Sequence, residues 1–134
     1  IALGSILAID PEVIIVDEPT TGQDWRESLY ICKILKKLNQ RGKTVVIITH
    51  EMDLVAAFAT RVIVLCKGRI LLDGTPREVF SKPEILEKTW VQPPQITRLS
   101  QKLSKLCAIP TMLTVDEMYD YLVENLKEVE MTWF

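Results

Sequence analysis

The stretch PEVIIVDEPTTGQD, residues 11–24, decides the fold because an apolar run ends directly in two carboxylates. Val13 to Val16 are four consecutive β-branched residues. A continuous run of this kind, without polar alternation, predicts a strand covered on both faces, as in parallel sheets. Asp17 and Glu18 come at the end of that strand, and Pro19 restricts the backbone as the chain leaves it.

A helix and a second strand are predicted to follow. Asp24, with Glu27 three residues later, has the pattern of a capping box, and Gly42 is placed to end the helix. Residues 44–49, TVVIIT, form a second β-branched run. Strand, helix and strand in this order predict a βαβ unit with two parallel strands in an α/β fold. The helix is predicted from apolar residues at helical spacing, which are Leu29, Cys32, Leu35 and Leu38.

Polar residues are expected to meet where the two strands end. In an open parallel sheet, ligands bind beyond the carboxyl ends of the strands. Asp17 and Glu18 follow the first strand and His50 follows the second. Taken singly, each has an ordinary explanation. Asp17 and Glu18 could form part of a turn, and His50 could be a cap or a side chain whose hydrogen bonds are made within the fold. Asp24 is most simply a helix cap. Their joint occurrence in this order favours a functional site.

Phosphoryl transfer is the chemistry that these groups suit. An aspartate at a strand end can hold the magnesium ion that neutralises phosphate charge. A second carboxylate beside it can orient or deprotonate an attacking water molecule. A neutral histidine nearby can donate a hydrogen bond to the terminal phosphate or to that water.

Composition sets limits on the class of protein. The chain has 134 residues, 48% hydrophobic and 25% charged, with a net charge of −2, which gives no indication of a nucleic-acid partner. It has no apolar run of about 18 residues and no secretory leader pattern. Three widely spaced cysteines favour a reducing cytosol. Because the first residue is Ile1, in a segment typical of the end of a helix, we expect the chain to be a fragment.

The combination VIIVDEPTTGQD and VVIITHEMD resembles the second half of an ABC-type ATPase domain. The apolar run with Asp-Glu-Pro resembles the Walker B motif, TTGQD resembles the D-loop, and His50 matches the switch histidine. This resemblance implies that Asp17 coordinates magnesium, that Glu18 is the catalytic carboxylate and that His50 contacts the γ-phosphate of ATP. It implies that Asp24 lies in a loop linking the two ATP sites of a dimer. The cofactor-binding residues would then be Asp17, Glu18, His50 and Asp24.

The resemblance implies a partial P-loop NTPase fold: a parallel sheet with flanking helices, a β-hairpin and a C-terminal helical appendix. Residues 1–90 would be the C-terminal part of the nucleotide-binding domain, and residues 91–134, beginning with VQPPQ, a helical extension. The hairpin is predicted from RVIVLCKGRILLDG around Lys67-Gly68. No GxxxxGK[ST] phosphate loop occurs in the chain, so we expect it to be inactive towards ATP by itself.

The tail resembles the C-terminal extension of energy-coupling factor ATPases, in VQPPQITRLSQKL and IPTMLTVDEMYDYL. That resemblance implies an importer of a vitamin or of a cobalt or nickel ion, peripheral on the cytoplasmic face of the membrane. The implied partners are a second ATPase subunit, a transmembrane coupling protein and a substrate-binding membrane protein. Two alternatives stay open: a soluble ABC ATPase outside transport, and a non-catalytic interaction or dimerisation module.

Overall fold

The computed structural model describes Gly4 and residues 8–126, and it divides into two compact units, residues 1–54 and 55–134. The helix expected at Ile1 to Ile9 falls mostly outside the described residues. Within the described part of the chain, no helix is long and apolar enough to cross a bilayer.

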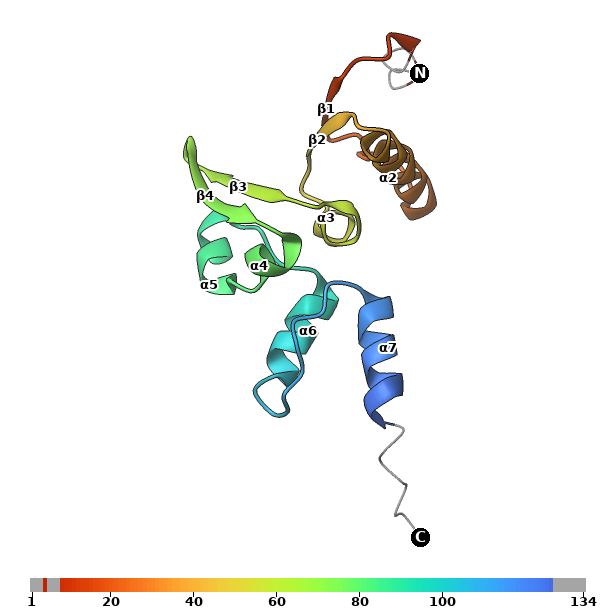
Figure 1. The fold of residues 1–134 in the computed structure, drawn as a ribbon. Coiled ribbons are helices and arrows are strands. Elements are labelled where there is room, and N and C mark those ends of the chain that lie inside the picture. Colours follow the sequence, from red (N-terminus) through yellow and green to blue (C-terminus); the bar gives the residue numbers. More distant parts are fainter. Residues whose placement is uncertain (1–3, 5–7, 127–134) are drawn as a thin grey trace. The chain divides into compact units, whose positions relative to one another are not determined.

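The first unit contains the predicted βαβ arrangement (Figure 1). Strand β1 (Val13–Asp17) pairs in parallel with β2 (Thr44–Ile48), and α2 (Trp25–Gln40) connects them. The register places Val13 beside Thr44 and Asp17 beside Ile48, so both strands end at the same edge. Gly42, with φ +90, follows the helix in the left-handed conformation that glycine adopts without strain.

The prediction that β1 is covered on both faces is wrong for this structure. Ile14 and Val16 are buried with Leu35 of α2, but Val13 and Ile15 on the opposite face are 55% and 63% exposed. Successive strand residues point to opposite faces, and α2 packs against only one of them. The exposed face continues on β2, where Val46 and Ile48 are 43% and 53% exposed.

Helix α3 (Met52–Phe58) begins in the first unit, and the second unit continues with the predicted hairpin. Strands β3 (Val62–Cys66) and β4 (Arg69–Gly74) pair antiparallel, with an irregularity between Val64 and Leu65. Lys67 and Gly68 both have positive φ, 48° and 74°, as the favoured two-residue hairpin turns require. Arg61 and Asp73 close the open end of the hairpin through two hydrogen bonds of 2.8 and 2.7 Å.

The rest of the second unit is helical. It comprises α4 (Pro76–Phe80), α5 (Pro83–Leu86), the 3₁₀ helix η1 (Glu87–Thr89), α6 (Gln95–Leu103) and α7 (Val115–Leu126). A capping box of Thr75 and Glu78 begins α4. Phe80 and Leu86 are completely buried. Gln101 of α6 donates a hydrogen bond to the carbonyl of Phe80 at 2.7 Å, so this bond connects segments on either side of residue 90. The domain boundary expected between residues 90 and 91 stays a prediction.

The most buried residues of helix α6 are polar. Thr97 and Ser100 are fully buried, whereas Leu99, which forms an apolar helical repeat with Ile96 and Leu103, is 46% exposed. The Thr97 hydroxyl donates to the Met112 carbonyl at 2.6 Å, and the Ser100 hydroxyl accepts from the Met112 N–H at 3.0 Å. These bonds pair both backbone polar groups of Met112, which lies in an irregular segment and is itself buried.

Candidate functional site

The carboxyl-terminal edge of the parallel pair brings Glu18 and His50 into direct contact. Nδ1 of His50 lies 2.7 Å from Oε1 of Glu18. The two residues are 32 positions apart in sequence, and each stands just beyond the end of its strand. The Glu18 N–H also donates to the Ile48 carbonyl at 2.8 Å, which continues the strand pairing by one residue.

The Glu18 backbone is in a conformation that a non-glycine residue rarely adopts. Its φ is +46°, in the left-handed region. Such strain costs about 1–3 kcal/mol and persists where surrounding contacts determine the conformation. Those contacts include the Thr21 N–H, which donates to the Glu18 carbonyl at 3.2 Å, and the hydroxyls of Thr21 and Thr49, which each lie 3.4 Å from Oε2.

The contact between the two side chains stabilises their charged forms. The hydrogen bond with His50 lowers the pKa of Glu18, and the same bond raises the pKa of His50 above its usual value. An ionised carboxylate can only accept, so Nδ1–H of His50 is the donor. The contact therefore shifts His50 towards its protonated form, whereas the sequence argument considered a neutral imidazole. Since the His50 side chain is 78% exposed, its other ring nitrogen, Nε2, stays accessible to a ligand.

Asp17 and Asp24 are placed differently from this pair. Asp17 is the last residue of β1, and its side chain is exposed on the face opposite α2. Asp24 caps α2: its Oδ1 accepts from the Glu27 N–H at 2.8 Å. The structure thus confirms Asp24 as an N-cap and brings together only Glu18 and His50 of the four predicted residues. The roles assigned to all four in ATP chemistry stay predictions.

The donor set suits a magnesium ion that shares its ligands with a nucleotide. Magnesium usually takes one or two carboxylates and completes its octahedral shell with water and substrate phosphates. Asp17 offers an exposed carboxylate next to Glu18. Among the described residues, no three histidine, cysteine or acidic side chains converge to form a complete metal cage. Asp17 therefore fits as a single ligand to a hydrated ion.

Two further residues at this edge were missed by the sequence argument. The Thr20 hydroxyl donates a hydrogen bond to Oε1 of Glu51, and Thr20 is only 2% exposed. The Glu51 N–H in turn donates to the Thr49 hydroxyl at 3.1 Å. Both residues adjoin predicted ones, Thr20 two positions after Glu18 and Glu51 directly after His50, but no sequence pattern indicates that their side chains meet.

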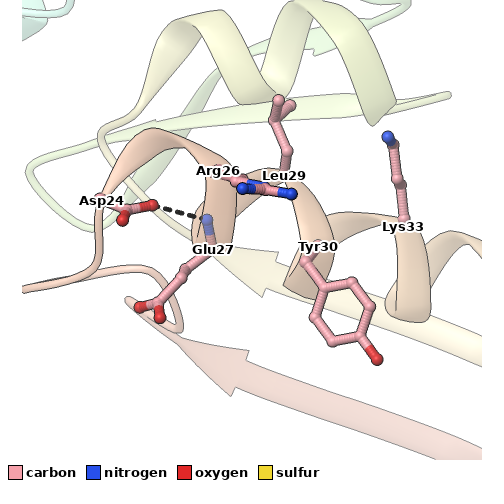
Figure 2. A pocket seen from close by; sticks show the side chains of 6 residues that line it. All are labelled: Asp24, Arg26, Glu27, Leu29, Tyr30 and Lys33. Atoms are coloured by element: carbon pink, nitrogen blue, oxygen red, sulfur yellow. Dashed lines mark hydrogen bonds between the residues drawn. The ribbon is translucent and has the colours of Figure 1, made fainter.

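A surface hollow beside α2 lies apart from these residues (Figure 2). Figure 2 shows the Asp24 cap bond at its margin and side chains of both charge signs along one helix. Neither Glu18 nor His50 lines it, so it is not the predicted phosphate site. Its lining residues all come from α2 and its cap, namely Asp24, Arg26, Glu27, Leu29, Tyr30 and Lys33.

No family model matches the chain, but it is similar to several known proteins. A putative ABC transporter ATP-binding protein of Methanosarcina acetivorans is 45% identical over 130 residues, which are 96% of this chain and 21% of that protein. The energy-coupling factor transporter ATP-binding protein EcfA of Methanocaldococcus jannaschii is 42% identical over 130 residues, 96% of this chain and 47% of the relative. EcfA2 of Streptococcus pyogenes is 44% identical over 103 residues, 77% of this chain and 37% of the relative.

A solved structure supports the same assignment. The chain matches cbiO1 of Clostridium perfringens, described as part of the ABC transporter complex cbiONQ, with a TM-score of 0.55 and 35% identity. The match covers 75% of this chain and 40% of cbiO1. The chain spans between about a fifth and a half of the length of these relatives. The predicted resemblance is therefore confirmed: the chain is a homologue of the ATP-binding proteins of ABC transporters, including those of energy-coupling factor transporters, and has part of their fold.

Proposed function

We propose that this chain supplies the water-activating edge of an ATP site in an ATPase that powers import by an energy-coupling factor transporter. The contact between Glu18 and His50 at the shared strand edge is the observation that carries this proposal. The similarity to EcfA, EcfA2 and cbiO1 supports the transporter type. The transported solute would be a vitamin or a metal ion.

Glu18 is the proposed general base. A carboxylate can accept a proton from the water that attacks the terminal phosphate of ATP. One oxygen of Glu18 is bonded to His50, while Oε2 has only two long contacts of 3.4 Å with threonine hydroxyls. Oε2 is thus the oxygen available to a water molecule. The lowered pKa of Glu18 keeps it ionised, as a base must be at neutral pH.

His50 is proposed to link that base to the nucleotide. Its Nδ1–H orients the Glu18 carboxylate, and a protonated imidazole can at the same time donate Nε2–H to a phosphate oxygen. Asp17 would hold the magnesium ion, which when bound neutralises charge on the phosphates. Asp24 would contribute to the contact between the two ATP sites of a dimer.

Other components are needed for activity. Binding of nucleotide phosphates depends on a loop with the pattern GxxxxGK[ST], which this chain lacks. We therefore expect the 134-residue chain alone not to bind magnesium-ATP at micromolar concentration. The proposed partners of the intact protein are a second ATPase subunit and the transmembrane and substrate-binding components of the importer, at the cytoplasmic face of the membrane. Micromolar binding of magnesium-ATP in a calorimetric titration of the 134-residue chain would contradict the expectation that the chain alone does not bind the nucleotide.

Replacement of Glu18 by Gln in the full-length protein tests the proposal. The amide cannot act as a base, so ATP hydrolysis should be lost while ATP binding is retained. Glu12→Gln is the matched control, because Glu12 is an exposed carboxylate just before β1, at the opposite end of the same strand. Retained turnover in Glu18→Gln would remove Glu18 from the catalytic role.

A further inference from the structure

We propose that Thr20 and Glu51 are positioning residues whose contact joins the two loops that carry Glu18 and His50. The inference rests on the proposed function, because it concerns the same site. Thr20 lies two residues after Glu18, and Glu51 directly follows His50. Neither residue is needed to bind a ligand in this scheme. Their task is to set the distance between the base and the imidazole.

The contact between Thr20 and Glu51 crosses from one loop to the other. The Thr20 hydroxyl donates to Oε1 of Glu51, across 31 positions of sequence. Thr49 adds a second connection, because its hydroxyl accepts from the Glu51 N–H at 3.1 Å and lies 3.4 Å from Oε2 of Glu18. Side chains from both loops are thus connected around the contact between Glu18 and His50.

Burial explains why this contact can hold the loops in place. Thr20 is 2% exposed and Glu51 is half-buried, whereas His50 is exposed. A buried hydroxyl that loses its acceptor stays without a partner, so the Thr20–Glu51 contact is costly to break. An exposed ion pair such as that of Glu18 and His50 gains little by itself and does not fix two loops. The buried contact therefore determines the geometry and the exposed one depends on it.

Glu51 is otherwise without a function in the proposed chemistry. Its backbone carbonyl accepts from the Leu54 N–H at 3.0 Å at the start of α3, and its N–H donates to the Thr49 hydroxyl at 3.1 Å. Its carboxylate points instead to Thr20, a residue of the loop after β1. The side chain and the backbone of Glu51 thus act separately, and they can be tested separately.

The single histidine of the chain provides a direct readout. In a long-range ¹H–¹⁵N spectrum, the Nδ1 shift of His50 reports whether that nitrogen donates to Glu18. Glu51→Ala and Thr20→Val remove opposite ends of the contact, and both should move the Nδ1 signal towards that of a free imidazole. Glu51→Gln and Thr20→Ser keep an acceptor and a donor, and both should leave the signal near its wild-type position. Asp53→Asn is the control, since Asp53 is an exposed carboxylate two residues from Glu51.

Circular dichroism shows whether each variant is folded. The test needs only one folded variant, either Glu51→Ala or Thr20→Val. An unchanged Nδ1 signal in folded Glu51→Ala or Thr20→Val would overturn the proposal. If both variants fail to fold while Glu51→Gln and Thr20→Ser fold, the contact serves stability alone and the proposal is also overturned.

ATP turnover in the full-length protein gives the second readout. Misplacement of a catalytic group by about 1 Å can cost on the order of 100-fold in rate, so Glu51→Ala and Thr20→Val should lower kcat about 100-fold. The KM for ATP should change much less, and Glu51→Gln and Thr20→Ser should restore most of kcat. If the wild-type protein hydrolyses no ATP, the proposed function fails, whereas the His50 spectrum still decides whether the contact positions the imidazole.

Discussion

Replacement of Asp24 separates the structural role of this residue from its predicted role in the ATP site. Asp24 precedes α2 with extended backbone angles, φ −74° and ψ 168°, and its Oδ1 accepts from the Glu27 N–H at 2.8 Å. Asparagine can make the same hydrogen bond without the charge, and alanine can make neither contribution. The two substitutions therefore remove the charge alone or the charge and the cap together.

The expected magnitudes follow from the cap geometry. Loss of an N-cap side chain costs about 1 kcal/mol of unfolding free energy, within a range of about 0.5–2, so Asp24→Ala should destabilise the chain by that amount. Asp24→Asn keeps the hydrogen bond and should lose less than Asp24→Ala, because it removes only the interaction of the charge with the helix dipole, about 0.3–1 kcal/mol at low salt. Arg26→Ala, an exposed residue of the same turn, is the control and should stay within about 0.5 kcal/mol of wild type.

Urea unfolding followed by circular dichroism measures these differences, with an unchanged slope showing that the unfolded state is comparable. Equal loss of stability in Asp24→Asn and Asp24→Ala would refute the capping argument, because the hydrogen bond would then contribute nothing. A stable Asp24→Asn variant of the full-length protein that has lost ATP turnover would support a role in the ATP site. Full turnover in that variant would leave Asp24 as a cap only.

Three further predictions concern the two units separately. Leu35→Ala should cost the first unit about 2–5 kcal/mol, since Leu35 is 1% exposed in its small core, and a loss below about 1 kcal/mol in urea unfolding would contradict that packing. Thr97→Val should cost the second unit about 1–3 kcal/mol, because the Met112 carbonyl loses its 2.6 Å hydrogen bond; equal stability of variant and wild type would show that this bond is dispensable. The Glu18–His50 contact should stabilise most between pH 4.5 and 6.5, the ordinary pKa values of the two groups. Because the pKa of Glu18 is lowered, this stabilisation is lost on the acidic side only when the pH falls through that lowered pKa. Because the pKa of His50 is raised, it is lost on the alkaline side only when the pH rises through that raised pKa. The difference in unfolding free energy between wild type and His50→Ala should therefore be largest in that window, and a difference independent of pH would exclude the ion pair.

Local patterns predicted the elements that position the site. The order of strand, helix and strand followed from β-branched runs around an apolar helical repeat, and the structure confirms it with β1 and β2 as direct parallel neighbours. The cap at Asp24 and the turn at Lys67-Gly68 also followed from residue type, because each depends on backbone geometry within a few positions. The convergence of Glu18 and His50 needed only the rule that parallel strands end at the same edge.

Burial was predicted less well, because it depends on which surfaces meet. The β-branched run of β1 is compatible with a sheet covered on one face or on both, and the described structure covers only the face towards α2. For α6, the most buried residues lie outside the apolar repeat, since the irregular segment around Met112 requires hydrogen-bond partners and Thr97 and Ser100 provide them. Apolar periodicity contains no information on such a requirement.

The site itself shows why its supporting residues escaped the sequence argument. Glu18 and His50 could be predicted because strand pairing alone brings their positions together. Thr20 and Glu51 meet only because the two loops beyond the strands take particular conformations, including the left-handed backbone at Glu18. Loop conformations of this kind depend on side-chain contacts between segments far apart in sequence, and such contacts leave no periodic pattern. The positions proposed to perform the chemistry can therefore be predicted from the strands, whereas the residues that hold them at their working distance depend on the three-dimensional arrangement of the loops.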